Sequence, residues 1–201
     1  KYRLSDVLDN NGVIALAQSM PNTKSSRFIQ WFTYSEETID GKSKSKAYAL
    51  FESGLIESIE VGTVKGLQQI HAYLFGGLYD FEGQIRNVNI AKGGFQFAMV
   101  QYLSQTLQQI EAMPATSFSE IVEKYVEMNV AHPFREGNGR ATRIWLDLLL
   151  KQQLCQCVDW SKIDKKQYLD AMVRSSVDST SIYNLLHGAL TNKINDRETF
   201  M

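Results

Sequence analysis

The segment from His132 to Arg143 gathers side-chain types that phosphoryl or nucleotidyl transfer needs. His132 is the candidate base, because an imidazole with an ordinary pKa near ~6.5 can accept a proton from a hydroxyl close to neutral pH. Glu136 is the candidate metal ligand, since Mg²⁺ usually takes only one or two carboxylates besides phosphate oxygens and water. These residue types favour a nucleotide-handling site.

The glycines and arginines of the same segment favour an anion as ligand. Gly137 and Gly139 would let the backbone N–H groups approach a phosphate closely, and Asn138 would add a side-chain donor. Residues 140–150 have a helical pattern, so this turn would lie at a helix N-terminus, where the N–H groups and the helix dipole attract anions. Arg140 and Arg143 are spaced i, i+3 on one helix face, where both could hold successive phosphates of one nucleotide.

The segment resembles the signature of the Fic family, His-x-Phe-x-(Asp/Glu)-Gly-Asn-Gly-Arg-x-x-Arg, with every defined position filled from His132 to Arg143. The resemblance covers roughly residues 44–201, including the run 67–71 and Gly93-Gly94-Phe95. It implies transfer of AMP from ATP to a Tyr, Ser or Thr hydroxyl of a target protein, with pyrophosphate leaving.

Carried over residue by residue, the resemblance gives each motif position a role. His132 would deprotonate the target hydroxyl and Glu136 would hold Mg²⁺, while Phe134 would anchor the loop in the core. The phosphates of ATP would be bound by Gly137, Asn138, Gly139, Arg140 and Arg143. Two alternatives stay open: a helical module that binds nucleotide without transfer, and a Fic relative that transfers another phosphate-containing group.

The elements around this segment are predicted to be mainly helical, giving an all-α bundle of the Fic type with a small β-hairpin flap. A helix over Val64–Phe75, with Thr63 as N-cap, places His71 on an apolar face as a core histidine. A capping box of Ser117 and Glu120 begins a helix that runs into His132. The other predicted helices span about 97–113, 140–150, 165–174 and 179–190, and the one over 140–150 is apolar on nearly all sides, as expected for a central helix.

One segment, about 85–97, has an alternating pattern around Lys92-Gly93-Gly94, which predicts a β-hairpin. The free edge of such a hairpin can pair with an extended target segment, which the resemblance also implies. The predicted target-docking residues are Val88, Ile90, Gly93, Gly94 and Phe95. Further candidate nucleotide contacts are Lys92, Asn129, Tyr168 and Met172. A hairpin that only caps the bundle, and a plain core role for Tyr168 and Met172, remain alternatives.

Composition limits the other classes of function. The net charge of −1 over 201 residues argues against direct nucleic-acid binding, and no apolar run is long enough for a membrane span. Cys155 and Cys157 fit neither a zinc set nor a disulfide framework, which suits reduced thiols in a cytoplasm. The resemblance implies a bacterial cytoplasmic protein acting as a toxin or regulator.

The domain prediction is an N-terminal extension at 1–43 and a Fic domain at 44–201. The aromatic cluster at 28–32 is expected to pack on the core or on a partner chain, which leaves a homo-oligomer open. Many Fic proteins carry an inhibitory (Ser/Thr)-x-x-x-Glu-(Gly/Asn) helix, and no such motif occurs in this sequence. The resemblance places that helix after residue 201, so we expect this form to be more active than one with the helix present.

Overall fold

The computed structural model describes residues 38–92, 94–196, 199 and 200. The chain divides into two compact units, Lys1–Ala47 and Tyr48–Met201. The predictions for the aromatic cluster at 28–32, and for Gly93 in the hairpin, lie outside the described residues.

Helices dominate the described part of the chain, as predicted. They are α3 (Ile39–Glu52), α4 (Val64–Phe75), α5 (Val100–Ala112), α6 (Phe118–Ala131), α7 (Asn138–Leu154), α8 (Lys165–Ser175) and α9 (Thr180–Gly188), with short 3₁₀ turns η2 (Leu55–Ser58) and η3 (Trp160–Lys162).

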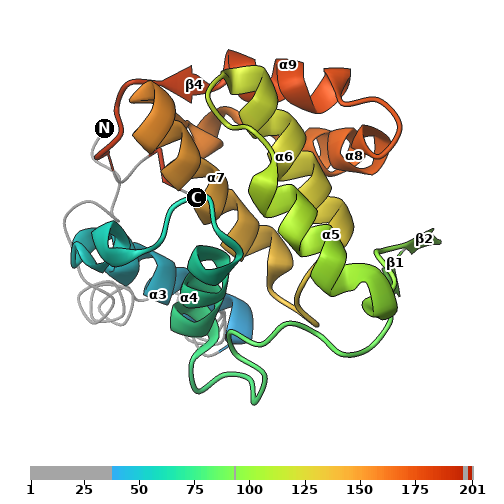
Figure 1. Ribbon diagram of the computed structural model, residues 1–201. Helices are drawn as coiled ribbons and strands as arrows, with labels where there is room; N and C mark the ends of the chain where they lie inside the picture. The colour runs from blue at the N-terminus through green and yellow to red at the C-terminus, as the bar shows by residue number, and fades with distance from the viewer. Residues whose placement is uncertain (1–37, 93, 197–198, 201) are drawn as a thin grey trace, which may run out of the picture. The chain divides into compact units, whose positions relative to one another are not determined.

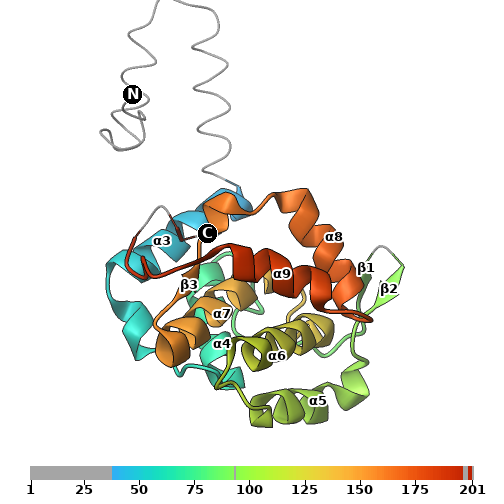
Figure 2. The ribbon, with the colours of Figure 1, turned by 90° about the horizontal axis from the view of Figure 1, so that it is seen from above.

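Helix α7 is the central element, packed against both α4 and α6 (Figures 1 and 2). Most of its side chains are buried, including Ile144, Trp145 and Leu146, which are fully covered. Trp145 also donates from its indole N–H to the Thr63 carbonyl (3.0 Å), which fixes the start of α4 against α7. The predicted apolar central helix is therefore confirmed.

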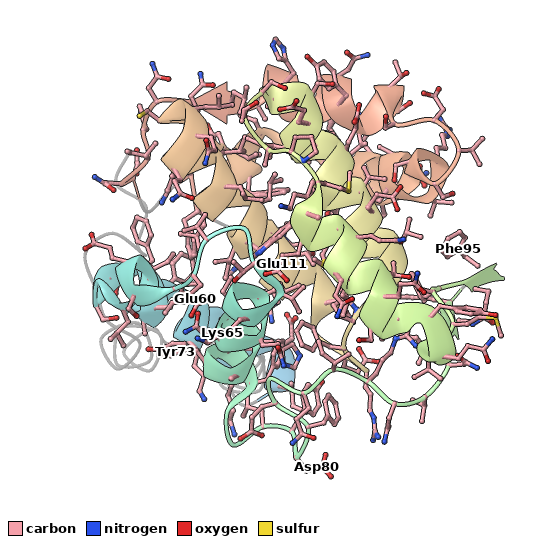
Figure 3. The ribbon with its side chains drawn as sticks, viewed as in Figure 1. Glu60, Lys65, Tyr73, Asp80, Phe95 and Glu111 are labelled. Carbon is pink, nitrogen blue, oxygen red and sulfur yellow. The ribbon has the colours of Figure 1, made fainter. Side chains whose placement is uncertain are left out.

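The predicted starts of α4 and α6 are confirmed, because both depend on local capping. Thr63 Oγ1 accepts from the Gly66 N–H (2.9 Å), and Ser117 and Glu120 form the complete capping box. Two further contacts lie at the start of α4, and Figure 3 labels their side chains: Glu60 and Lys65 form an ion pair, and Glu111 on α5 accepts from the Val64 N–H (3.4 Å).

The hairpin is shorter than predicted. Strands β1 (Ala91–Lys92) and β2 (Phe95–Gln96) pair antiparallel, Ala91 with Gln96 and Lys92 with Phe95, at the edge of the bundle (Figure 1). One more hydrogen bond, from the Phe97 N–H to the Ile90 carbonyl (3.3 Å), extends the pairing. Val88 and Ile90 therefore precede the strand rather than belonging to it, and this correction also delays the start of α5 from 97 to 100.

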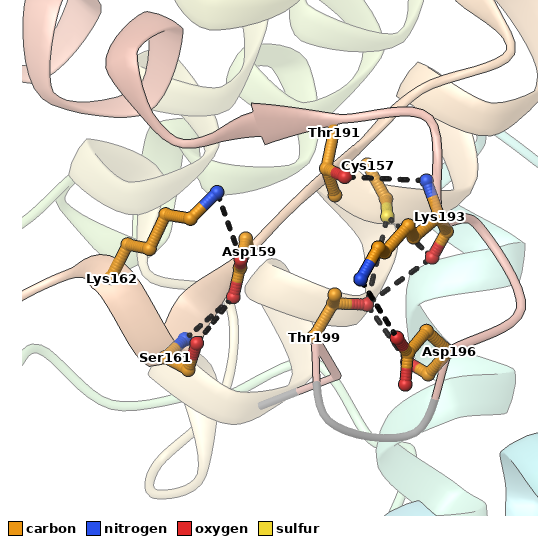
Figure 4. A network of polar contacts seen from close by, with 8 residues as sticks. All are labelled: Cys157, Asp159, Ser161, Lys162, Thr191, Lys193, Asp196 and Thr199. Atoms are coloured by element: carbon orange, nitrogen blue, oxygen red, sulfur yellow. Dashed lines mark hydrogen bonds and ion pairs between the residues drawn. The ribbon is translucent and has the colours of Figure 1, made fainter.

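A second strand pair was not predicted, because each strand has only two residues. Strands β3 (Cys157–Val158) and β4 (Leu190–Thr191) pair antiparallel, so α9 ends at Gly188 rather than at 190. A polar network joins this pair to the C-terminal segment (Figure 4): Cys157 Sγ on β3 donates to the Lys193 carbonyl (3.7 Å), and Thr199 Oγ1 donates to the Asp196 carbonyl (2.8 Å). The Trp160 N–H donates to the Thr199 carbonyl (3.1 Å), which ties the segment that carries Trp160 to this network.

Both cysteines are free thiols, Cys155 exposed and Cys157 buried, and burial raises the pKa of the Cys157 thiol. Among the described helices, none combines the length and apolarity that a membrane crossing requires.

Candidate functional site

The motif forms the junction between α6 and α7. Helix α6 ends at His132, whose φ of 50° is left-handed, and α7 begins after Gly137, whose φ of 78° is also left-handed. The chain therefore reverses within a few residues, and the N-terminus of α7 lies next to the end of α6.

His132 is held by two contacts. Its Nδ1 lies 3.2 Å from the Asn129 carbonyl, and its ring stacks on Phe97 at 3.8 Å and 16°. Since a carbonyl can only accept, we assign the proton to Nδ1, which leaves the lone pair on Nε2. Burial is the main cause that lowers the His132 pKa to about 4; the Asn129 carbonyl opposes this, and the positive charges of Arg86 and Lys92 add to it. The ring is therefore neutral and able to accept a proton at neutral pH.

His71 fixes the loop between the two helices. It is fully buried, stacks on Phe134 at 3.8 Å, and its Nε2 lies 2.9 Å from the Glu136 carbonyl. Its Nδ1 accepts from the Gly83 N–H (2.9 Å), so the Nε2–H donates to Glu136. The predictions of a core histidine and of Phe134 as a buried anchor are confirmed; the bond from His71 to the motif backbone was not predicted.

Asn138 has a different role from the predicted one. Its side chain is 2% exposed, its Oδ1 accepts from the Phe134 N–H (2.8 Å), and its Nδ2 donates to the Phe134 carbonyl (2.7 Å). The amide therefore braces the loop, and we withdraw the prediction that it adds a side-chain donor for an anion. The predicted anion site then depends on the backbone N–H groups of residues 137–139, because the first N–H groups of a helix have no acceptors within it.

Arg143 lies on an aromatic shelf formed by Trp160 and Tyr168. Its guanidinium carbon is 5.5 Å from the Trp160 ring centre and 6.0 Å from that of Tyr168. Tyr168 is buried and its hydroxyl bonds that of Tyr125, while the Trp160 indole donates to Asp147 Oδ2 (2.7 Å). The two rings stand at 84° to each other, and these hydrogen bonds hold both of them beside the Arg143 guanidinium.

Two of the predicted nucleotide contacts, Tyr168 and Asn129, have partners within the protein. Tyr168 supports Arg143 and bonds Tyr125, which matches the alternative of a core role. Asn129 also has a structural role, because its Nδ2 donates to the Tyr125 carbonyl (2.8 Å) and its backbone carbonyl orients His132. Met172 is half-buried one turn further along α8, and its contact with nucleotide stays a prediction.

The remaining predicted residues surround the junction. The Glu136 side chain is exposed beside the glycine turn, and Gly139 has open space around it, with Arg143 Nη1 3.9 Å from the position of an added Cβ. Lys92 is exposed on β1, close enough for its charge to act on His132. The Lys92 charge and the N-terminus of α7 thus lie near the histidine, and the Glu136 carboxylate lies on the loop that joins the two helices.

Sequence reasoning missed Arg86 entirely. This buried arginine donates to the carbonyls of both Ala131 and His132 at the end of α6 (3.0 and 2.7 Å). Burial lowers the pKa of its guanidinium. No local pattern marks it, since its acceptors lie far away in the sequence.

The shelf under Arg143 gives a first testable prediction. Trp160→Leu removes the ring face, so we expect ATP to bind about 2- to 30-fold more weakly, as the loss of a cation–π contact of roughly 0.5–2 kcal/mol implies. Isothermal titration with ATP measures this. Tyr183→Leu is the matched control, because Tyr183 packs on Phe118 and His187; equal affinities in both variants would contradict a supporting role for Trp160.

The helical bundle and its motif junction define a Fic-type domain, and the comparisons with known proteins agree. Residues 62–150 match the model of the Fic/DOC family, and this stretch includes the whole motif junction. The protein adenylyltransferase VbhT of Bartonella schoenbuchensis is 33% identical over 126 residues, which are 56% of this chain and 25% of VbhT. A relative named "Probable protein adenylyltransferase Fic" from Escherichia coli is 28% identical over 156 residues, 70% of this chain and 78% of that protein.

Two solved structures share the fold. The Bartonella tribocorum BepC protein with bound AMPPNP superposes with a TM-score of 0.62 at 17% identity, over 76% of this chain and 86% of that one. The N-terminal Fic domain of a Bartonella quintana cell filamentation protein with bound ADP gives a TM-score of 0.63 at 16% identity, over 87% and 89%. At these identities the likeness shows the fold alone.

Proposed function

We propose that the chain is a magnesium-dependent protein adenylyltransferase that moves AMP from ATP to a hydroxyl side chain of a target protein. The observation that carries the proposal is the state of His132 at the junction of α6 and α7: a neutral ring with Nδ1 on the Asn129 carbonyl, which leaves Nε2 as the proton acceptor. The names of VbhT and of the Escherichia coli relative support the same activity. Since this chain spans only a quarter of VbhT, we propose the activity for the Fic domain itself.

In the proposed reaction His132 Nε2 removes the proton from the target hydroxyl as its oxygen bonds the α-phosphorus of ATP. The bond from that phosphorus to the bridging oxygen breaks, and pyrophosphate leaves with the electron pair. The N–H groups at the start of α7 and the Arg143 guanidinium offset the negative charge of the phosphates. The protein acts mainly by positioning and by charge, as in phosphoryl transfer generally.

Glu136 is the proposed holder of Mg²⁺. Within the part of the chain that the structure describes, no three His, Cys, Asp or Glu side chains group into a metal site, so the ion would depend on this one carboxylate, ATP oxygens and water. The exposed Glu136 side chain beside the glycine turn fits that mode, and His71 fixes the backbone that carries it. When bound, Mg²⁺ supplies neutralising charge to the phosphates.

The hairpin is the proposed docking element for the target. Phe95, which Figure 3 labels beside β2, packs edge-on against Phe97, and Phe97 in turn stacks on His132. A target strand paired with the hairpin would therefore lie one aromatic layer from the base. Val88 is 44% exposed at the foot of the hairpin and offers an apolar contact.

The test is a labelling experiment with the wild-type chain. It is incubated with ATP labelled at the α-phosphate, with Mg²⁺ and with extract of the native host, and the products are denatured and analysed by mass spectrometry. Covalent label with the added mass of AMP, lost when Mg²⁺ is chelated, supports the proposal. Tight ATP binding without covalent label would support the nucleotide-binding module instead, and the mass of phosphate or phosphocholine would indicate another transferase.

The pH dependence of the reaction follows from the lowered pKa of His132. Because the ring loses its proton near pH 4 rather than near ~6.5, we expect kcat/KM to rise through about pH 4 and to be level from about pH 5 to neutrality. The lowered pKa also affects stability, because below about pH 6.5 the unfolded chain binds a proton at His132 that the folded chain does not. The contribution of His132 to the free energy of unfolding is therefore complete above about pH 6.5 and falls as the pH drops toward 4. An NMR titration of the histidine ring signals measures the pKa of His132, and only three histidines have to be assigned. A midpoint near ~6.5 for His132 would contradict this prediction.

A further inference from the structure

Arg86 uses its whole guanidinium to bind backbone carbonyls. The side chain is 3% exposed and lies in the segment between α4 and the hairpin. Its Nε donates to the His132 carbonyl (2.7 Å), Nη1 to Val88 (2.7 Å), and Nη2 to Ala98 (2.5 Å) and Ala131 (3.0 Å).

These four carbonyls belong to two parts of the site. Val88 and Ala98 precede and follow the hairpin, while Ala131 and His132 end α6. The carbonyls at a helix end have no partners within the helix, so a buried cation there also stabilises the helix dipole. One guanidinium thus joins both ends of the hairpin to the residue proposed as the base.

Two backbone hydrogen bonds also join the segments on either side of the hairpin to the end of α6 and the residue after it. The Arg86 N–H donates to the Pro133 carbonyl (2.8 Å), and the Ala98 N–H donates to the Val130 carbonyl (3.3 Å). Together with the stacking of Phe97 on His132, these bonds place the hairpin and the end of α6 in one hydrogen-bonded unit. Arg86 is at the centre of that unit.

We propose that Arg86 is a positioning residue that fixes the distance between the hairpin and the His132 imidazole, and with it the distance between a docked target hydroxyl and its base. The inference rests on the proposed function, but Arg86 itself touches neither ATP nor target in it. Only an arginine suits this role, since its planar fork offers five donors in several directions, whereas a lysine presents three from one point.

The test therefore compares Arg86→Lys, which keeps the charge and loses the fork, with Lys124→Met. Lys124 is the matched control, because it is also a buried cation on carbonyls: it is 4% exposed and its Nζ donates to Glu111 (2.9 Å) and Met113 (3.2 Å) at the end of α5. Both variants lose carbonyl hydrogen bonds to a buried cation, but only Arg86→Lys alters the unit that holds the hairpin.

The first measurement needs no catalysis. Hydrogen exchange followed by NMR should show the Phe97 and Ala98 amides exchanging at least about tenfold faster in Arg86→Lys, while α7 amides such as that of Trp145 keep wild-type protection. Lys124→Met should leave the Phe97 and Ala98 amides unchanged. Wild-type protection of these two amides in Arg86→Lys, or an equal loss in Lys124→Met, would overturn the proposal.

The second measurement separates positioning from binding. Arg86→Lys should keep the wild-type Kd for ATP within about twofold, since Arg86 does not contact the α7 N-terminus, and should lower kcat/KM for the target about 10- to 100-fold, as a small misplacement of reacting groups does. Unchanged transfer would overturn the proposal. If the wild-type chain transfers no AMP, the proposed function fails, and the exchange measurement alone decides the role of Arg86.

Discussion

His132→Ala should lower the rate of AMP transfer by about 10²- to 10⁴-fold, the range that loss of a general base produces. The target hydroxyl would then have to lose its proton to water in a half-buried site. ATP affinity should stay near the wild-type value, because the phosphates are proposed to bind at the α7 N-terminus and Arg143, not at the imidazole. Single-turnover transfer of labelled AMP, with ATP binding measured separately, checks both parts.

Two further variants make this result specific. His132 has a left-handed backbone, which asparagine adopts more readily than alanine, so His132→Asn should reproduce the loss of transfer with less effect on folding. His187→Ala should keep the wild-type rate, because His187 is exposed and packs on Phe118 and Tyr183. Transfer within about threefold of wild type in His132→Asn would contradict a role as base.

The sequence predicts well those features that local chemistry determines. Thr63 begins α4 and the Ser117–Glu120 box begins α6, because each cap bonds N–H groups within its own first turn. The central position of α7 is equally predictable, since a helix that is apolar on nearly all sides must be covered on all sides. These signals need no knowledge of the rest of the chain.

Features that depend on contacts between distant segments were predicted poorly. The hairpin is shorter than its alternating pattern suggests because the Val88 carbonyl accepts from Arg86, and α5 begins only at Val100, whose N–H donates to Asn89 Oδ1 (2.8 Å) on the other side of the hairpin. Asn138 looked like an anion donor from its place in the glycine turn, yet its amide is used by Phe134. In each case a polar group found its partner across the fold, which spacing along the chain does not reveal.

Gly137→Ala should be the most destabilising single-methyl change in the motif. The φ of 78° is left-handed, which costs a non-glycine residue roughly 1–2 kcal/mol. An added Cβ would also lie 2.3 Å from Phe75 Cε2 and 2.5 Å from Cζ, and Phe75 is only 2% exposed, so its ring has little room to move. Such overpacking costs a further ~1–3 kcal/mol. We therefore expect a lower free energy of unfolding in urea, and weaker ATP binding because the start of α7 must shift.

Gly139→Ala is the control that separates stability from binding. Gly139 lies inside the first turn of α7, and its added Cβ meets nothing closer than Arg143 Nη1 at 3.9 Å, so the fold should be unchanged or up to about 1 kcal/mol more stable. The same methyl would intrude between the backbone N–H groups and Arg143, where the phosphates are proposed to bind. ATP affinity should therefore fall in both variants while stability falls only in Gly137→Ala. Undiminished ATP binding by a stable Gly139→Ala protein would mean that the phosphates bind elsewhere than over this turn.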